Sequence, residues 1–151
     1  MGTASAGAPA AQADLVEVFL GERRMELKRD GQTIKRYRVA LGFAPECHKE
    51  REGDGRTPEG SYTVDARNPQ SAFHLSLRVS YPDQTDKAHA AALGLSPGGD
   101  IYIHGQPNGV RKFWTGHPNK DWTTGCVAVT DGEMRDLWSL VPTGARVVIH
   151  P

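Results

Sequence analysis

The sequence predicts a mainly β domain with one or two short helices, and three observations carry that prediction. Short runs in which apolar and polar residues alternate, typical of half-buried strands, recur along most of the chain. Glycine and proline are abundant, with 17 and 10 among 151 residues, which suits a protein with many turns. Helical signals are confined to two segments, at 83–95 and 130–141.

The first strands are expected at residues 15–20, 25–29 and 33–40, where apolar and charged residues alternate. Asp30 and Gly31 lie between the second and third of these runs. An Asp-Gly pair favours positive φ at both central positions of a tight turn, so it is a strong hairpin signal. We therefore expect the second and third strands to pair as a hairpin.

The rest of the chain alternates strand and helix signals. An alanine-rich helix is expected over residues 83–95, where Gly94 can end it. A second helix is expected over residues 130–141, because Thr130 and Glu133 have the spacing of a capping box. Further strands are expected at 61–67, 71–82, 101–104, 125–130 and 145–151, with polar loops at 44–60 and 111–122.

The N-terminal segment differs in composition from the rest. Residues 1–13 are mostly Gly, Ala, Ser, Thr and Pro, and no charged side chain precedes Asp14. They lack the basic and apolar regions of a secretion signal. We expect residues 1–13 to be a flexible leader or the remnant of a signal segment, and residues 14–151 to form one domain.

The composition argues against two classes of partner. The 18 basic and 18 acidic side chains balance, so no overall field attracts the chain to nucleic acid. No stretch approaches the roughly 20 apolar residues that a membrane span requires. The sequence therefore predicts neither a nucleic-acid partner nor a membrane span.

Cys126 is the first candidate for chemistry, within the stretch DWTTGCVAV at residues 121–129. A free cysteine is most often a small buried hydrophobe. Here, however, Gly125 precedes the sulfur, and a turn over 123–125 can direct backbone N–H groups at the oxygen of an attacked carbonyl. Cys47 lies in a segment of different character, and the sequence leaves open whether it pairs with Cys126.

His104 is the candidate base for that thiol. It ends the short apolar strand IYIH and is followed by Gly105, so its imidazole can stand at the end of a strand beside the one that carries Cys126. A Cys/His pair is the minimum arrangement for an activated thiol. The other histidines are more typical of surface or edge positions: His48, His74, His89, His117 and His150.

Motifs for metals and cofactors are missing from the sequence. A structural zinc site needs four ligands at a recognisable spacing, and neither C-x₂-C nor H-x₃₋₅-H occurs. Phosphate-binding and dinucleotide-binding motifs are also missing. We therefore predict no metal and no cofactor.

Several of these motifs, in this order, resemble the YkuD-type L,D-transpeptidases of bacterial cell walls, in the branch with a DWTxGC active-site motif. The similarity covers about residues 14–151. It implies a β-sandwich or barrel of mixed sheets with one or two short helices. The segments that carry it are GDGRTPEGSYTV, FHLSLRVSYP, IYIHG, DWTTGCVAV and GARVVIHP.

The resemblance implies roles for the candidate residues. Cys126 would be the acyl-accepting nucleophile and His104 its general base. The backbone at Thr124, Gly125 and Cys126 would form the oxyanion hole. Gly105 would let the substrate approach the strand that ends at His104.

The resemblance also implies a substrate. Cys126 would attack the carbonyl of the third residue of a peptidoglycan tetrapeptide stem, usually diaminopimelate with its side-chain carboxylate, and release D-alanine. An amine of a second stem would take the acyl group. Carbapenem-type β-lactams would be covalent inhibitors. The protein would be exported to the periplasm or cell envelope.

Two positions depart from the common family motif. Thr124 stands where the family has a histidine, and Ala128 where it has an arginine that can bind a carboxylate. These departures leave open a carboxypeptidase or hydrolase acting on stems or on wall-attached protein, and a non-catalytic peptidoglycan-binding domain. Candidates for substituting contacts with the substrate are Arg56, Asp121, Trp122 and Thr123. We also predict that the pKa of Cys126 lies below the free-thiol value of about 8.5.

Overall fold

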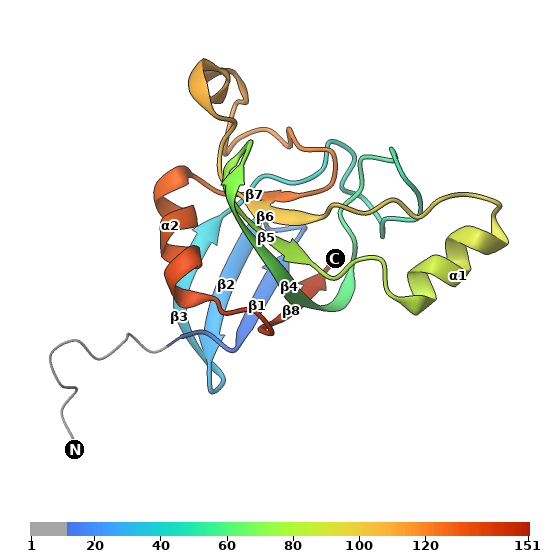
Figure 1. The fold of residues 1–151 in the computed structure, drawn as a ribbon, viewed down its shortest axis with the longest axis horizontal. Helices are drawn as coiled ribbons and strands as arrows, with labels where there is room; N and C mark the ends of the chain where they lie inside the picture. Colours follow the sequence, from blue (N-terminus) through green and yellow to red (C-terminus); the bar gives the residue numbers. More distant parts are fainter. Residues whose placement is uncertain (1–11) are drawn as a thin grey trace, which may run out of the picture.

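The computed structural model describes residues 12–151, which form eight strands and three short helical segments (Figure 1). In chain order these are β1 (Leu15–Phe19), β2 (Arg24–Arg29), β3 (Gln32–Arg38), β4 (Gly60–Ser71), β5 (His74–Val79), α1 (Gln84–Ala92), β6 (Tyr102–His104), the 3₁₀ segment η1 (Gly109–Trp114), β7 (Val127–Ala128), α2 (Asp131–Leu140) and β8 (Arg146–His150). The mainly β prediction is confirmed.

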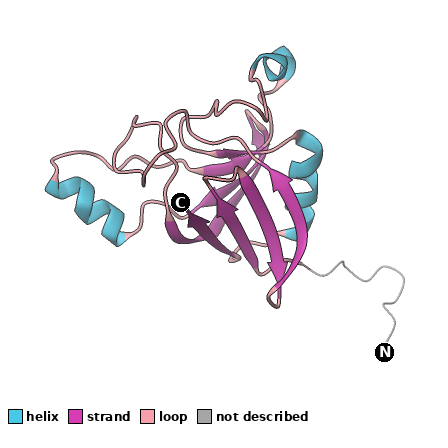
Figure 2. Cartoon of the chain, turned by 180° about the vertical axis from the view of Figure 1, so that it is seen from behind, coloured by secondary structure: helices cyan, strands magenta, loops and turns pink. Residues whose placement is uncertain are grey.

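The strands form one mixed sheet in the order β3-β2-β1-β8-β4-β5-β6-β7. The pairs β1/β8 and β6/β7 are parallel and the other neighbours are antiparallel. The long strand β4 belongs to both halves, because residues 60–63 pair with β8 and residues 64–71 pair with β5. The sheet curls as a result, and Figure 2 shows its strands turning around one interior.

The two edges of the curled sheet meet just beyond β3. Ala40 and Ala128 exchange backbone hydrogen bonds of 3.0 and 2.9 Å, and Gly42 bridges Thr123. The chain that leaves β3 therefore pairs with β7 and with the turn that precedes it. This closure brings the segment around Cys126 into the middle of the fold.

Local signals place the turn and the helix starts. Asp30 and Gly31 have φ values of 50° and 81°, as the hairpin turn between β2 and β3 requires. The Thr130 side chain caps α2 and forms the predicted capping box with Glu133. Helix α1 begins with a capping box as well, from Asp83.

The core lies inside the curled sheet and extends to one helix. Helix α2 contributes Met134 and Leu137 to it, both fully buried. Helix α1 stands away from the sheet, and Asp86 and Ala90 are its buried residues (Figure 1). The α-helix that packs on the sheet is thus α2, which contacts β5.

Two expectations for this half of the chain need correction. Strand β7 has two residues instead of the predicted 125–130, because the chain before it is occupied by a hydrogen-bonded turn. Cys126 therefore lies on that turn and not within a strand. The expected loop at 111–122 begins inside η1.

At the N-terminus, residues 1–11 of the predicted leader lie outside the described residues. Ala13 is buried and its N–H donates to the carbonyl of Leu140. Of the helices in residues 12–151, none has the length and apolar character needed to cross a membrane.

Candidate active site

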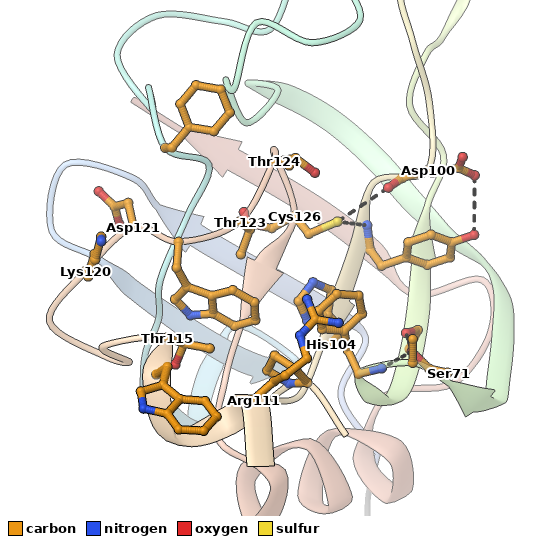
Figure 3. Close-up of a pocket in the computed structure, with 18 of the residues that line it drawn as sticks. Ser71, Asp100, His104, Arg111, Thr115, Lys120, Asp121, Thr123, Thr124 and Cys126 are labelled. Carbon is orange, nitrogen blue, oxygen red and sulfur yellow. Dashed lines mark hydrogen bonds between the residues drawn. The ribbon is translucent and has the colours of Figure 1, made fainter. Parts of the chain in front are cut away.

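A pocket of about 910 Å³ opens beside β6 and β7 and contains both Cys126 and His104 (Figure 3). Strand register brings the two residues together. In the parallel pair of β6 and β7, His104 stands opposite Ala128. Cys126 precedes Ala128 by two residues, so it lies beside Tyr102, two residues before His104. The predicted adjacency of the two segments is confirmed.

The sulfur of Cys126 is held by backbone groups of the segment that leads into β6. The N–H of Tyr102 donates to Sγ at 3.3 Å, and Sγ donates to the carbonyl of Asp100 at 3.4 Å (Figure 3). The thiol thus has a fixed position and a proton acceptor in its resting form.

Burial decides the protonation state of Cys126. The residue is 8% exposed. Burial raises the pKa of Cys126 to about 11, and neither the Tyr102 N–H nor the Lys49 charge offsets it. The prediction of a pKa below that of a free thiol is wrong, because the fold encloses the sulfur without pairing it with a cation. At neutral pH the group is a thiol.

His104 is buried as well, with 3% exposure, and burial lowers its pKa to about 4. Its Nδ1 lies 2.7 Å from the carbonyl oxygen of Gly105. A carbonyl accepts only, so Nδ1 carries the proton of the neutral ring and Nε2 keeps its lone pair. His104 is therefore a neutral imidazole with a free basic nitrogen.

Aromatic side chains fix the plane of the His104 ring. Phe73 stacks on it with ring centroids 4.4 Å apart and planes 24° apart. Trp122 packs against it at a tilt, with centroids 5.7 Å apart, and its Nε1–H donates to Nδ1 of His117 at 3.3 Å. The imidazole is thus oriented by its backbone bond and by two neighbouring rings.

The turn before Cys126 is organised by Thr123. Its hydroxyl donates to the carbonyl of Cys126 at 2.7 Å and accepts the N–H of Gly125 at 3.2 Å. Gly125 has a φ of +143°, and a Cβ there would lie 2.9 Å from the carbonyl oxygen of Arg56. Only glycine satisfies both conditions at this position.

The turn also revises the predicted oxyanion hole. The N–H of Gly125 is already bonded to Thr123. Within residues 12–151, the N–H groups of Thr124 and Cys126 donate to no other protein group. These two groups are the ones that can stabilise a negative oxygen beside Sγ.

This arrangement is suited to nucleophilic acyl transfer. A thiol, a neutral imidazole with a free Nε2 and two unengaged backbone N–H groups belong to one site. The imidazole can accept the thiol proton as sulfur attacks a carbonyl, and the N–H groups can stabilise the oxygen that becomes negative.

Comparison with known proteins agrees with this chemistry. Residues 13–149 match the family model of the YkuD L,D-transpeptidase catalytic domain. The chain belongs to the YkuD family. Members of this family act on peptidoglycan, and the sequence resemblance is confirmed.

The sequence identity between this chain and individual relatives is low. YafK of Escherichia coli K12, named as a candidate L,D-transpeptidase, is 26% identical over 145 residues, which are 90% of this chain and 50% of YafK. The helical cell shape determining protein Pgp2 of Campylobacter jejuni is 21% identical with a TM-score of 0.69, over 92% of this chain and 48% of Pgp2. LdtMt1 in complex with imipenem is 13% identical with a TM-score of 0.57, over 89% of this chain and 57% of LdtMt1. The chain thus spans about half the length of these relatives.

Among the residues predicted to contact substrate, Asp121, Trp122 and Thr123 line the pocket of this YkuD domain, as does Thr124 of the predicted oxyanion hole. The carboxylate of Asp121 is already engaged, because the Arg23 guanidinium donates to it at 2.7 to 3.2 Å and the N–H of Leu41 at 3.1 Å. Asp121 therefore anchors the loop that carries Trp122 to the hairpin side of the sheet.

Arg56 and Gly105 do not line the pocket. Nη1 of Arg56 donates to Glu50 at 2.7 Å, so its guanidinium is already paired within the protein. At Gly105, a Cβ would lie 2.6 Å from Oδ1 of Asp131, so this glycine permits close packing rather than the approach of a substrate. Ala128, at the position of the family arginine, is fully buried with its N–H and C=O bonded to Ala40.

The pocket also contains residues that the sequence did not single out. Phe73 could have been found, because it precedes the alternating run of β5. The positions of the others depend on loops whose paths carry no local signal. They include Asp100, Tyr102, Arg111, Trp114 and Lys120.

The two cysteines are both free, Cys126 buried and Cys47 exposed, so the open question of a disulfide is answered in the negative. In the described part of the chain, no group of three or more His, Cys, Asp or Glu side chains is placed to hold a metal ion.

Proposed function

We propose that this protein is a cysteine-dependent peptidoglycan L,D-transpeptidase, with residues 14–151 in its catalytic domain. Sγ of Cys126 attacks the carbonyl of the third residue of a tetrapeptide stem and D-alanine leaves. An amine of a second stem then takes the acyl group and forms a cross-link. The observation that supports this most strongly is that a neutral thiol and a neutral, oriented imidazole share one pocket.

The protonation states define how each step balances. As the C–S bond forms, Nε2 of His104 takes the thiol proton, and it passes that proton to the D-alanine nitrogen as the C–N bond breaks. The acceptor amine then attacks the thioester and gives a proton to His104, which returns it to sulfur. Because the thiol is a much weaker acid than imidazolium here, the first proton transfer accompanies C–S bond formation and does not precede it.

The relatives support further parts of the proposal. Peptidoglycan lies in the cell envelope, so the protein acts in the periplasm or cell envelope. The likeness to Pgp2 supports a contribution to cell shape. The imipenem complex of LdtMt1 supports carbapenems as covalent inhibitors that acylate Cys126.

The product spectrum on defined stems tests the proposal. The protein is incubated with tetrapeptide muropeptides and the products are weighed, with Cys126→Ala as the inactive variant and Cys47→Ala as the matched control. We expect cross-linked dimers with loss of D-alanine from the parent and from Cys47→Ala. Tripeptides without dimers would show that the protein is a carboxypeptidase, with water as the acceptor, and not a transpeptidase. Equal product from Cys126→Ala would contradict a cysteine enzyme.

A further inference from the structure

The η1 segment projects from the body next to the pocket, and its base is fixed (Figure 1). On one side, Asn108 donates through its N–H to Ala72 and through Nδ2 to Ser71, both at 3.0 Å. On the other side, the Thr115 hydroxyl donates to the side chain of Gln106 at 2.9 Å. These hydrogen bonds fix the base of η1, and those of Asn108 attach it to the turn between β4 and β5.

The side chains of the projection are exposed, yet two of them line the pocket. Phe113 and Trp114 are 74% and 75% exposed. Arg111 and Trp114 belong to the pocket wall, and Figure 3 shows the Arg111 side chain running from η1 into the pocket toward His104. The Arg111 side chain forms no hydrogen bond or ion pair with any residue from 12 to 151.

The charges around the pocket leave this cation unneutralised. Of the two pocket carboxylates, Asp121 is paired with Arg23. Asp100 accepts from the Tyr102 hydroxyl at 3.4 Å and lies on the other side of Cys126 from Arg111 in Figure 3. A cation that faces a partly enclosed pocket without a partner favours an anionic group in the ligand.

We propose that Arg111 binds a carboxylate of the stem peptide and so orients the scissile carbonyl toward Cys126. The planar guanidinium can donate two parallel hydrogen bonds to a carboxylate. Position 128 cannot supply this contact, because Ala128 is enclosed where the sheet edges meet. The stem is the substrate of the proposed function, so this role of Arg111 rests on that function. The carboxylate is that of the terminal D-alanine or that of the third-residue side chain.

Binding measured without turnover tests this role. Tetrapeptide stems are titrated by calorimetry into Cys126→Ala and into the same protein with Arg111→Ala, Arg111→Lys or Lys112→Ala added. Lys112 is the matched control, because it is an adjacent cation of η1 that lies over the Phe113 ring and outside the pocket wall. We expect Kd to rise about 10-fold or more with Arg111→Ala, less with Arg111→Lys, and to change by less than about 2-fold with Lys112→Ala.

Two amidated stems identify the carboxylate. One has the D-alanine carboxylate converted to an amide and the other has the third-residue side-chain carboxylate converted. One of the two amidated stems should bind more weakly than the unmodified stem to Cys126→Ala, but equally well to Cys126→Ala with Arg111→Ala added. The carboxylate converted in that stem is the one that Arg111 binds. Equal losses with and without Arg111 for both stems would overturn the proposal.

The outcome is separable from that of the proposed function. If the parent turns over stems and Arg111→Ala leaves Kd unchanged, the proposed role of Arg111 is wrong and the proposed transpeptidase function stands. If stem binding depends on Arg111 but the parent turns over no stem, the carboxylate site stands and the proposed enzymatic function is wrong. Thermal unfolding of Arg111→Ala should match the parent, because the side chain has no partner to lose.

Discussion

Two segments border the same pocket and are built in opposite ways. In the turn at 121–126, the side chains of Asp121 and Thr123 are engaged in hydrogen bonds with the protein. In η1, the side chains of Arg111, Phe113 and Trp114 reach into solvent or into the pocket. The groups that perform chemistry are thus fixed by the fold, and the groups that can meet a substrate are on a projection that the fold leaves uncovered.

This difference separates chemistry from recognition. A change in the turn alters packing and reactivity together, because Cys126 and His104 are both buried. A change in η1 alters contact with the ligand and leaves the core as it is. Substitutions in the two segments should therefore differ in the kind and the size of their effects.

The largest effect is that of pH on the thiol. With a pKa raised to about 11, the thiolate fraction of Cys126 grows about tenfold for each pH unit up to that value. Alkylation by iodoacetamide, mapped to the Cys126 peptide to separate it from Cys47, should therefore increase about 100-fold between pH 8 and 10. A plateau reached by pH 8.5 would show an activated thiolate and contradict the enclosed neutral pair.

The next effect is on the turn itself. Thr123→Val keeps the shape of the side chain but removes the hydroxyl that bonds the Cys126 carbonyl and the Gly125 N–H. The free energy of unfolding should fall by about 1–3 kcal/mol, because these buried groups lose their partner. Urea unfolding measures it, with Thr124→Val as the exposed control. Equal stability of the two variants would mean that Thr123 does not hold the turn.

The smallest effect is expected on the projection. Phe113→Ser removes a large apolar side chain that is 74% exposed. The free energy of unfolding should change by less than about 0.5 kcal/mol, since almost no buried surface is lost. A loss as large as that of Thr123→Val in the same urea series would show that η1 is part of the folded core.

The sequence predicts the parts of the fold that rest on neighbours in the chain. The turn at Asp30 and Gly31 and the cap at Thr130 are set by backbone preferences of a few adjacent residues. The pair of Cys126 and His104 could be named because each lies in a recognisable motif. The parallel pairing of β6 with β7 then brings the two residues to one pocket.

What the sequence could not give depends on contacts between distant segments. The pKa of Cys126 is raised by burial, and the sulfur is enclosed beside Tyr102 and Asp100, which precede it by 24 and 26 residues. The anchoring of Asp121 requires Arg23, at a separation of 98 residues. The place of Arg111 in the pocket depends on the path of a whole loop, for which no local pattern exists.

The central claim is that Cys126 is a buried thiol that His104 activates during attack on a carbonyl. Intact-mass and peptide mapping after exposure to imipenem test it most directly, in the parent, Cys126→Ala and His104→Ala. We predict a single adduct on Cys126 in the parent, none in Cys126→Ala, and formation at least about 100-fold slower in His104→Ala, as expected when a general base is lost. No adduct on Cys126 in the parent, or an unchanged rate in His104→Ala, would contradict it.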